Sequence, residues 1–187
     1  MLYDKDIREP LFRHFEERYK KVRIMEEKTM ILCRADAIIV LPDKLVGVEI
    51  KSDADNYSRL ARQIKEYDTV CDMNYVVVGS THANHILSHV PEWWGVLSVE
   101  PYEAEADFYL IREPQSNPKA ELETKLKLLW RSELAHIQKL SGMPKYAGKS
   151  KDYVRKKILA KIPRSILQQQ ISEELFERDY TIFRDRT

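Results

Sequence analysis

The sequence MILCRADAIIVL of residues 30–41 decides the fold, together with LVGVEIK of residues 45–51, which follows it after a short interruption. Both runs are rich in aliphatic and β-branched residues, which favour β-strands. Between them, Pro42 and Asp43 are typical turn residues. The two runs are therefore predicted to pair as an antiparallel hairpin.

Three of the charged residues in these apolar runs, Asp36, Glu49 and Lys51, form a pattern. Glu49 and Lys51 are two positions apart in the second run, so both side chains leave the same face of the strand. Asp36 lies on the neighbouring strand. Burying such groups is costly unless they bind something. Two carboxylates and a lysine that converge in one sheet are what metal-dependent cleavage of phosphodiester bonds requires.

The tripeptide Glu-x-Lys is a weak signal by itself, because it occurs three times in the chain. Only the copy at Glu49 ends an apolar strand that follows a strand carrying an aspartate. The other copies lie in charged surroundings and are interpreted as solvated pairs. They are Glu26 with Lys28 and Glu123 with Lys125.

Asp36, Glu49 and Lys51 resemble the motif of the PD-(D/E)XK nuclease superfamily, with Ala35 in place of the proline that names it. Gln63 and Tyr67 resemble the Q-x-x-x-Y signature of its RecB-like branch. Their i, i+4 spacing places both side chains on one helix face. The resemblance covers residues 5–100 and extends to small bacterial and phage members of the superfamily.

The resemblance implies a restriction-endonuclease-like core and a Mg²⁺- or Mn²⁺-dependent deoxyribonuclease. Asp36 and Glu49, with the carbonyl of Ile50, would hold the ion, since hard cations prefer oxygen ligands. Lys51 would orient the attacking water and stabilise charge on the phosphate. Glu9, on the first helix, could add a ligand.

Gln63 and Tyr67 would position the substrate strand or the lysine. Two other interpretations stay open. The chain could be an inactive nucleic-acid-binding relative, in which Asp36 and Lys51 form an ion pair, or a structural partner in a phage or defence assembly. The preference for DNA over RNA and for single or double strands is also open.

The rest of the chain predicts an α/β fold with a mixed sheet flanked by helices. A helix over Asp6–Tyr19 precedes the hairpin, and a second helix begins at Asp53 or Asp55. Another helix is expected at Ser80–His89. Further strands are expected at Val22–Glu27, Tyr75–Val78, Trp94–Val99 and Phe108–Ile111.

Polar residues 115–118 mark the predicted boundary between a core of residues 1–115 and an all-helical extension of residues 116–187. The extension is expected to hold helices at Pro118–Lys139, Lys149–Lys161 and Pro163–Arg178. The extension carries 16 Lys and Arg against 9 Asp and Glu, which gives it a net charge of +7. The core carries 15 Lys and Arg against 21 Asp and Glu, which gives it a net charge of −6. A basic segment beside an acidic core suggests a polyanionic partner, although a solvated helical surface explains the charge equally well.

Helices around residues 134–159 resemble a SAP-like helix–loop–helix module that binds DNA. In that interpretation five basic side chains contact phosphates, which fix position without reading sequence. They are Lys145, Lys149, Lys151, Arg155 and Lys156. A helical cap or a homodimerisation unit remains an equal alternative.

The composition indicates an ordinary globular protein, with 43% hydrophobic and 33% charged residues. The charged amino terminus has no apolar stretch of a signal peptide, and no run reaches the ~18 apolar residues of a membrane span. The two cysteines are too few for a disulfide framework. A cytoplasmic protein without a membrane partner is therefore expected.

Overall fold

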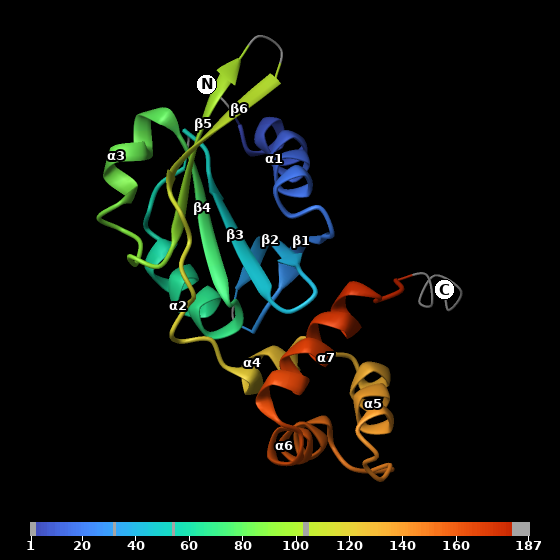
Figure 1. The fold of residues 1–187 in the computed structure, drawn as a ribbon. Helices are drawn as coiled ribbons and strands as arrows, with labels where there is room; N and C mark the ends of the chain where they lie inside the picture. Colours follow the sequence, from blue (N-terminus) through green and yellow to red (C-terminus); the bar gives the residue numbers. More distant parts are fainter. Residues whose placement is uncertain (1–2, 32, 54, 103–104, 181–187) are drawn as a thin grey trace, which may run out of the picture.

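A six-stranded mixed sheet forms the centre of the computed structural model, which describes residues 3–31, 33–53, 55–102 and 105–180 (Figure 1). The strands lie in the sheet in the same order as in the chain. The middle pairs β3–β4 and β4–β5 are parallel, and the outer pairs are antiparallel. The predicted α/β class with a mixed sheet is confirmed. The strands are β1 (Arg23–Thr29), β2 (Arg34–Val40), β3 (Leu45–Lys51), β4 (Met73–Gly79), β5 (Gly95–Tyr102) and β6 (Glu105–Arg112).

The hairpin predicted from residues 30–51 is present as β2 and β3, which pair antiparallel from Ala37 opposite Val48 to Val40 opposite Leu45. Its turn closes with a hydrogen bond from the Leu41 amide to the Lys44 carbonyl at 2.9 Å. Every residue of β3 is buried. A strand that is covered on both faces in this way is typical of the centre of an α/β sheet.

Helices cover both faces of the sheet (Figure 1). Helix α1 (Asp4–Tyr19) packs on one face, where Ile7, Leu11 and Phe15 join a cluster with Val46 and Val48. Helix α2 (Leu60–Val70), the 3₁₀ turn η1 (Ser80–His82) and the short helix α3 (Ala83–Ile86) lie on the opposite face.

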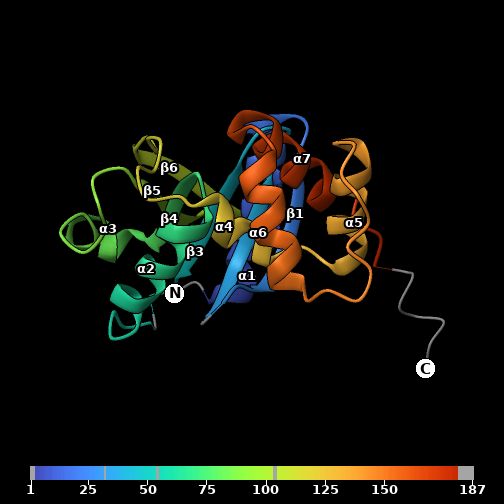
Figure 2. The ribbon, with the colours of Figure 1, turned by 90° about the horizontal axis from the view of Figure 1, so that it is seen from below.

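In the described part of the chain, four helices follow β6 and gather at one end of the molecule, the lower end in Figure 1 and the near side in Figure 2. Their apolar residues, such as Leu126 and Ile171, belong to the same hydrophobic cluster as Ile38 and Val40 of β2. The core is therefore continuous across the boundary predicted at Gln115. The helices are α4 (Leu122–Lys127), α5 (Arg131–Leu140), α6 (Lys151–Lys161) and α7 (Arg164–Phe176).

A partly buried polar group, which we call the joint cluster, connects these helices to the sheet. It consists of Asp72, Lys125 and Gln168. The Lys125 ammonium, 2% exposed, donates to Asp72 and to Oε1 of Gln168 at 2.6 Å. The Gln168 amide in turn donates to Asp72 Oδ2 and to the Asp43 carbonyl, both at 3.1 Å. The joint cluster thus combines one carboxylate with one ammonium.

The predicted start of α2 was wrong by at least five residues, since the helix begins at Leu60. Acidic side chains hold the preceding residues in a loop. Asp55 accepts from the amide and hydroxyl of Ser52, and Asp53 accepts from the Thr81 hydroxyl. Such side-chain hydrogen bonds compete with the helical ones.

Two other helix predictions also need correction. The helix expected over Ser80–His89 is η1 followed by α3, which ends at Ile86. The single helix expected over Pro118–Lys139 is broken into α4 and α5. Trp130 is extended there, and its amide donates to Glu133 at the start of α5.

Helices α6 and α7 lie within two residues of their predicted ends. In the part of the chain that the structure describes, no helix has the length and apolar character needed to cross a membrane.

Candidate acidic pocket

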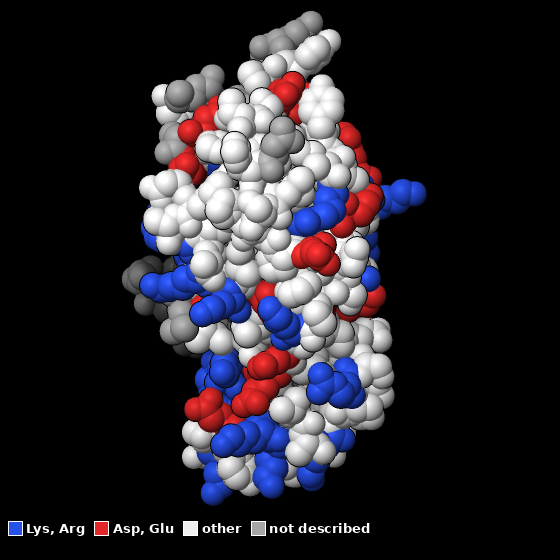
Figure 3. Space-filling model, turned by 90° about the vertical axis from the view of Figure 1, so that its left-hand side faces the viewer, with Lys and Arg blue, Asp and Glu red and all other residues white. Residues whose placement is uncertain are grey.

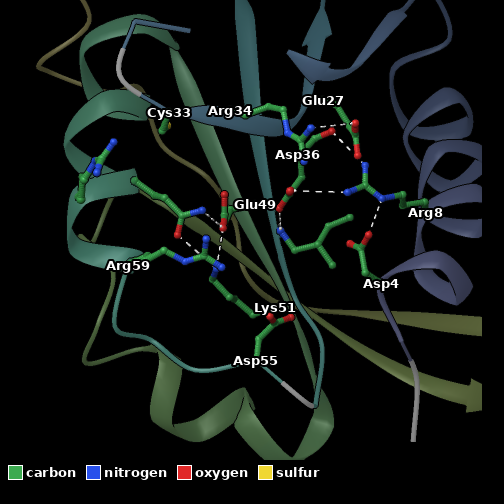
Figure 4. A pocket seen from close by; sticks show the side chains of 13 residues that line it. Asp4, Arg8, Glu27, Cys33, Arg34, Asp36, Glu49, Lys51, Asp55 and Arg59 are labelled. Atoms are coloured by element: carbon green, nitrogen blue, oxygen red, sulfur yellow. Dashed lines mark hydrogen bonds and ion pairs between the residues drawn. The ribbon is translucent and has the colours of Figure 1, made fainter. Parts of the chain in front are cut away.

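A cavity of about 470 Å³ lies where β3 ends, and four of the predicted site residues line it: Asp36, Glu49, Lys51 and Gln63 (Figure 4). Ile50 is also part of the lining. Tyr67 lies beneath the cavity, fully buried. The strand and helix periodicities therefore bring these six residues to one place.

Alternation along β3 turns Gly47, Glu49 and Lys51 toward α2. Gly47 is required for close packing, because a Cβ atom there would lie 2.4 Å from the Tyr67 ring. The absence of a side chain at this position lets the tyrosine pass under the strand. Its hydroxyl then reaches the backbone of both β2 and β3.

Strands β2 and β3 part beyond the pair Ala37–Val48, and the cavity opens where they separate. The Tyr67 hydroxyl bridges the gap: it donates to the Val48 carbonyl at 2.8 Å and accepts from the Asp36 amide at 3.2 Å. The Asp36 carboxylate accepts from the Ile50 amide at 2.8 Å. Side chains thus replace the backbone hydrogen bonds of the sheet at this point.

Glu49, Lys51 and Gln63 form a small hydrogen-bonded group. The Lys51 ammonium lies 2.7 Å from Glu49 Oε1 and donates to Gln63 Oε1 at 3.2 Å. The Gln63 amide donates to the same Oε1 atom of Glu49. The other carboxylate oxygen, Oε2, is buried and has no hydrogen-bond partner among the described residues.

Burial and the charge of Asp36 raise the pKa of Glu49 to about 7, although Lys51 opposes the shift. Burial also raises the pKa of Asp36, against the Ile50 amide and the Arg8 guanidinium, which favour its ionised form. Burial is the largest cause of both shifts, because it disfavours the charged form of a carboxyl group. The pocket would therefore be stabilised by further positive charge.

The pocket offers some of the oxygen donors that a divalent cation takes. Glu49 Oε2 is an unused anionic oxygen, and carboxylate and carbonyl oxygens are the ligands that Mg²⁺ and Mn²⁺ prefer. Among the described residues, no three His, Cys, Asp or Glu side chains are grouped closely enough to hold a metal ion. An ion here would need backbone and water oxygens as well, which is usual for Mg²⁺.

A family model described as bacteriophage P4 protein cII matches residues 23–185. The chain belongs to this family. Comparison with curated proteins and with solved structures gave no match. The family match begins at β1 and runs through α7. It therefore covers the whole sheet and the C-terminal helices of this cII-family chain, whereas α1 lies outside it.

Helix α1 brings Asp4 and Arg8 to the pocket, and both were missed from the sequence. Arg8 Nε donates to Asp4 at 2.6 Å, and the same guanidinium lies 3.6 Å from Asp36 Oδ1. Glu9, the expected extra ligand, is exposed and does not line the cavity. One residue along a helix turns a side chain by about 100°, so the turn of α1 that presents Arg8 points Glu9 away. The sequence feature that could have identified Asp4 and Arg8 is their i, i+4 spacing, which predicts an ion pair on one helix face.

Cys33 also lines the cavity, but burial raises the pKa of its thiol to about 12. Since the thiolate is the nucleophile and metal ligand, this cysteine is unsuited to either role at neutral pH.

The basic residues predicted to bind nucleic acid lie around the loop between α5 and α6. Lys145, Lys149 and Lys156 are exposed, and Lys151 is half-buried, which lowers its pKa. Arg155 donates to the Leu126 carbonyl and to Asp152, so it stabilises the helical end itself. Figure 3 shows Lys and Arg concentrated on the lower part of one face of this cII-family chain, where α4–α7 lie.

Proposed function

We propose that this chain is a metal-dependent deoxyribonuclease with a restriction-endonuclease-like core. The observation that carries the proposal is the acidic pocket at the parting of β2 and β3. It holds the buried Glu49 and the half-buried Asp36 beside Lys51, raises the pKa of Glu49 to about 7 and leaves Glu49 Oε2 without a partner among the described residues. Such an arrangement is costly for folding alone and suits a site that binds a cation.

Asp36, Glu49 and the carbonyl of Ile50 would hold Mg²⁺ or Mn²⁺. When bound, the ion would polarise the phosphate and lower the pKa of the attacking water. Lys51 has a different role, because its ammonium holds the water and stabilises negative charge that develops on the phosphate. Gln63 fixes that ammonium by accepting from it while donating to Glu49.

Tyr67 acts through the backbone. Its hydroxyl holds the Asp36 amide and the Val48 carbonyl, so it sets the separation of the two strands that carry the carboxylates. We assign Tyr67 as a positioning residue, with Gly47 providing the space for its ring.

The exposed lysines Lys145, Lys149 and Lys156 would recruit DNA through its phosphates, as the SAP-like resemblance suggests. Lys151 and Arg155 would contribute to the local potential. We place the enzyme in cytoplasmic DNA repair, recombination or phage and defence processes.

Cleavage of single- and double-stranded DNA in Mn²⁺ tests the proposal. We expect Asp36→Asn and Lys51→Ala each to lose about 10²–10³-fold in rate, the usual cost of removing a group that stabilises developing charge. Asp43→Asn is the matched control, since Asp43 is exposed at the opposite end of β3 and should keep full activity.

Equal activity in all four proteins would identify a contaminant. Salt-sensitive DNA binding by a wild type that cuts no substrate would instead identify an inactive binding protein. Replacing the three exposed lysines by alanine should reduce the dependence of DNA affinity on salt by about 2–3 in the log–log slope.

A further inference from the structure

Arg59 reaches into the acidic pocket from the start of α2. It is the residue just before the helix and is exposed to solvent. Figure 4 shows its guanidinium turned toward Glu49 and Lys51. The loop that ends at Arg59 is held by Asp53 and Asp55, which fix its position at the rim.

The two basic residues on the other side of the pocket are already engaged. Arg8 is bound by Asp4 and lies against Asp36, and Arg34 forms an ion pair with Glu27 at 3.2 Å. The Arg59 side chain, in contrast, makes no hydrogen bond or ion pair with another described residue. Arg59 thus differs from Arg8 and Arg34, whose charges are paired.

We infer that Arg59 binds a backbone phosphate of the substrate strand, an inference that rests on the nuclease function proposed above. A phosphate that approaches Asp36 and Glu49 meets two carboxylates whose neighbouring cations, Arg8 and Lys51, already face them, so binding needs more positive charge. A guanidinium holds a phosphate through two parallel hydrogen bonds, which fixes its orientation as well as its position. The strand therefore enters over the start of α2.

The same helix offers a matched control. Lys65 is also basic and exposed on α2, but it lies outside the acidic pocket. Loss of general attraction between the helix and a polyanion would affect both positions alike. If Arg59 contacts a phosphate directly, only the substitution at Arg59 would weaken binding.

The test is fluorescence anisotropy with a short fluorescein-labelled single-stranded oligonucleotide in Ca²⁺, with cleavage in Mn²⁺ measured in parallel. We expect Arg59→Ala to weaken binding by about tenfold or more. The log–log slope against salt should fall by about 0.7, the value for one phosphate contact on a single strand. Arg59→Lys should keep the slope and lose part of the affinity, and Lys65→Ala should match the wild type.

The possible failures are distinguishable. If Arg59→Ala binds and cuts like Lys65→Ala while the wild type is active, the inference is overturned and the nuclease function stands. If Arg59→Ala cuts more slowly but binds the oligonucleotide like the wild type, the inference that Arg59 binds the substrate strand is also overturned. If no protein cuts DNA but binding still depends on Arg59, the nuclease function falls and the phosphate site remains.

Discussion

The acidic pocket and the joint cluster both bury a lysine against carboxylates, at opposite ends of β3. In the joint cluster, Lys125 satisfies Asp72, and Gln168 completes the hydrogen bonds of both groups. In the acidic pocket, Lys51 stands beside two carboxylates, and an oxygen of Glu49 has no partner among the described residues.

We interpret the joint cluster as serving folding and propose that the acidic pocket serves binding. A buried pair contributes to stability only when its charges and hydrogen bonds are compensated. The joint cluster meets this condition within the protein. In the acidic pocket, Glu49 Oε2 has no partner among the described residues, and in the proposed function a bound cation would provide one.

The largest expected effect is at the joint cluster. Lys125→Met should leave Asp72 partly buried without its partner and lower the free energy of unfolding by about 3 kcal/mol. That corresponds to a fall of about 6–12 °C in Tm. Urea denaturation measures it, with Lys127→Met, at an exposed position on the same helix, as a control expected to change by less than about 0.5 kcal/mol. Equal stability of the two variants would show that the joint cluster is not required for folding.

The acidic pocket should make stability fall as pH rises. The pKa of Glu49 is about 7 in the folded protein against an ordinary 4.5, so between these values the unfolded chain releases a proton that the folded protein keeps. The free energy of unfolding therefore decreases across this window, by about 3 kcal/mol in total, and is unaffected by Glu49 outside it. Urea denaturation from pH 4 to pH 8 should show this slope in the wild type and a flatter one in Glu49→Gln. Parallel profiles would exclude Glu49 as the titrating group.

Metal should remove part of that instability. At an excess of about a hundredfold over its dissociation constant, Mn²⁺ should stabilise the folded protein by about 2–3 kcal/mol. The stabilisation should vanish in Asp36→Asn and persist in Asp43→Asn, as read from Tm with and without the ion. An unchanged wild-type Tm over millimolar concentrations would mean that the acidic pocket is not a cation site.

Much of the fold follows from local patterns in the sequence. The hairpin, the buried strand β4 and the amphipathic helices depend on periodicity that each segment carries by itself. The wrong helix predictions arise where side-chain hydrogen bonds compete with the helical ones. Asp53 and Asp55 delay the start of α2 by bonding to loop groups, and Glu133 starts a new helix at Trp130, which is not a usual capping residue.

The site was predictable where periodicity fixes which side chains share a face, as for Glu49 with Lys51 and Gln63 with Tyr67. It was not predictable where a contact depends on the rotation of a whole helix about its axis. Arg8 rather than Glu9 reaches the pocket because of how α1 packs on the sheet, and the sequence around them does not record that angle.

The Tyr67 bridge also bears on kinetics. Because its hydroxyl and the Asp36 carboxylate hold β2 and β3 apart before any ligand is present, the cavity does not have to open on encounter. We therefore expect an ion to enter in one kinetic phase whose rate rises linearly with ion concentration. Tyr67→Phe removes the bridge and keeps the ring packed against Gly47. This variant should show an additional, slower phase whose rate does not depend on ion concentration, because the two strands separate and close again.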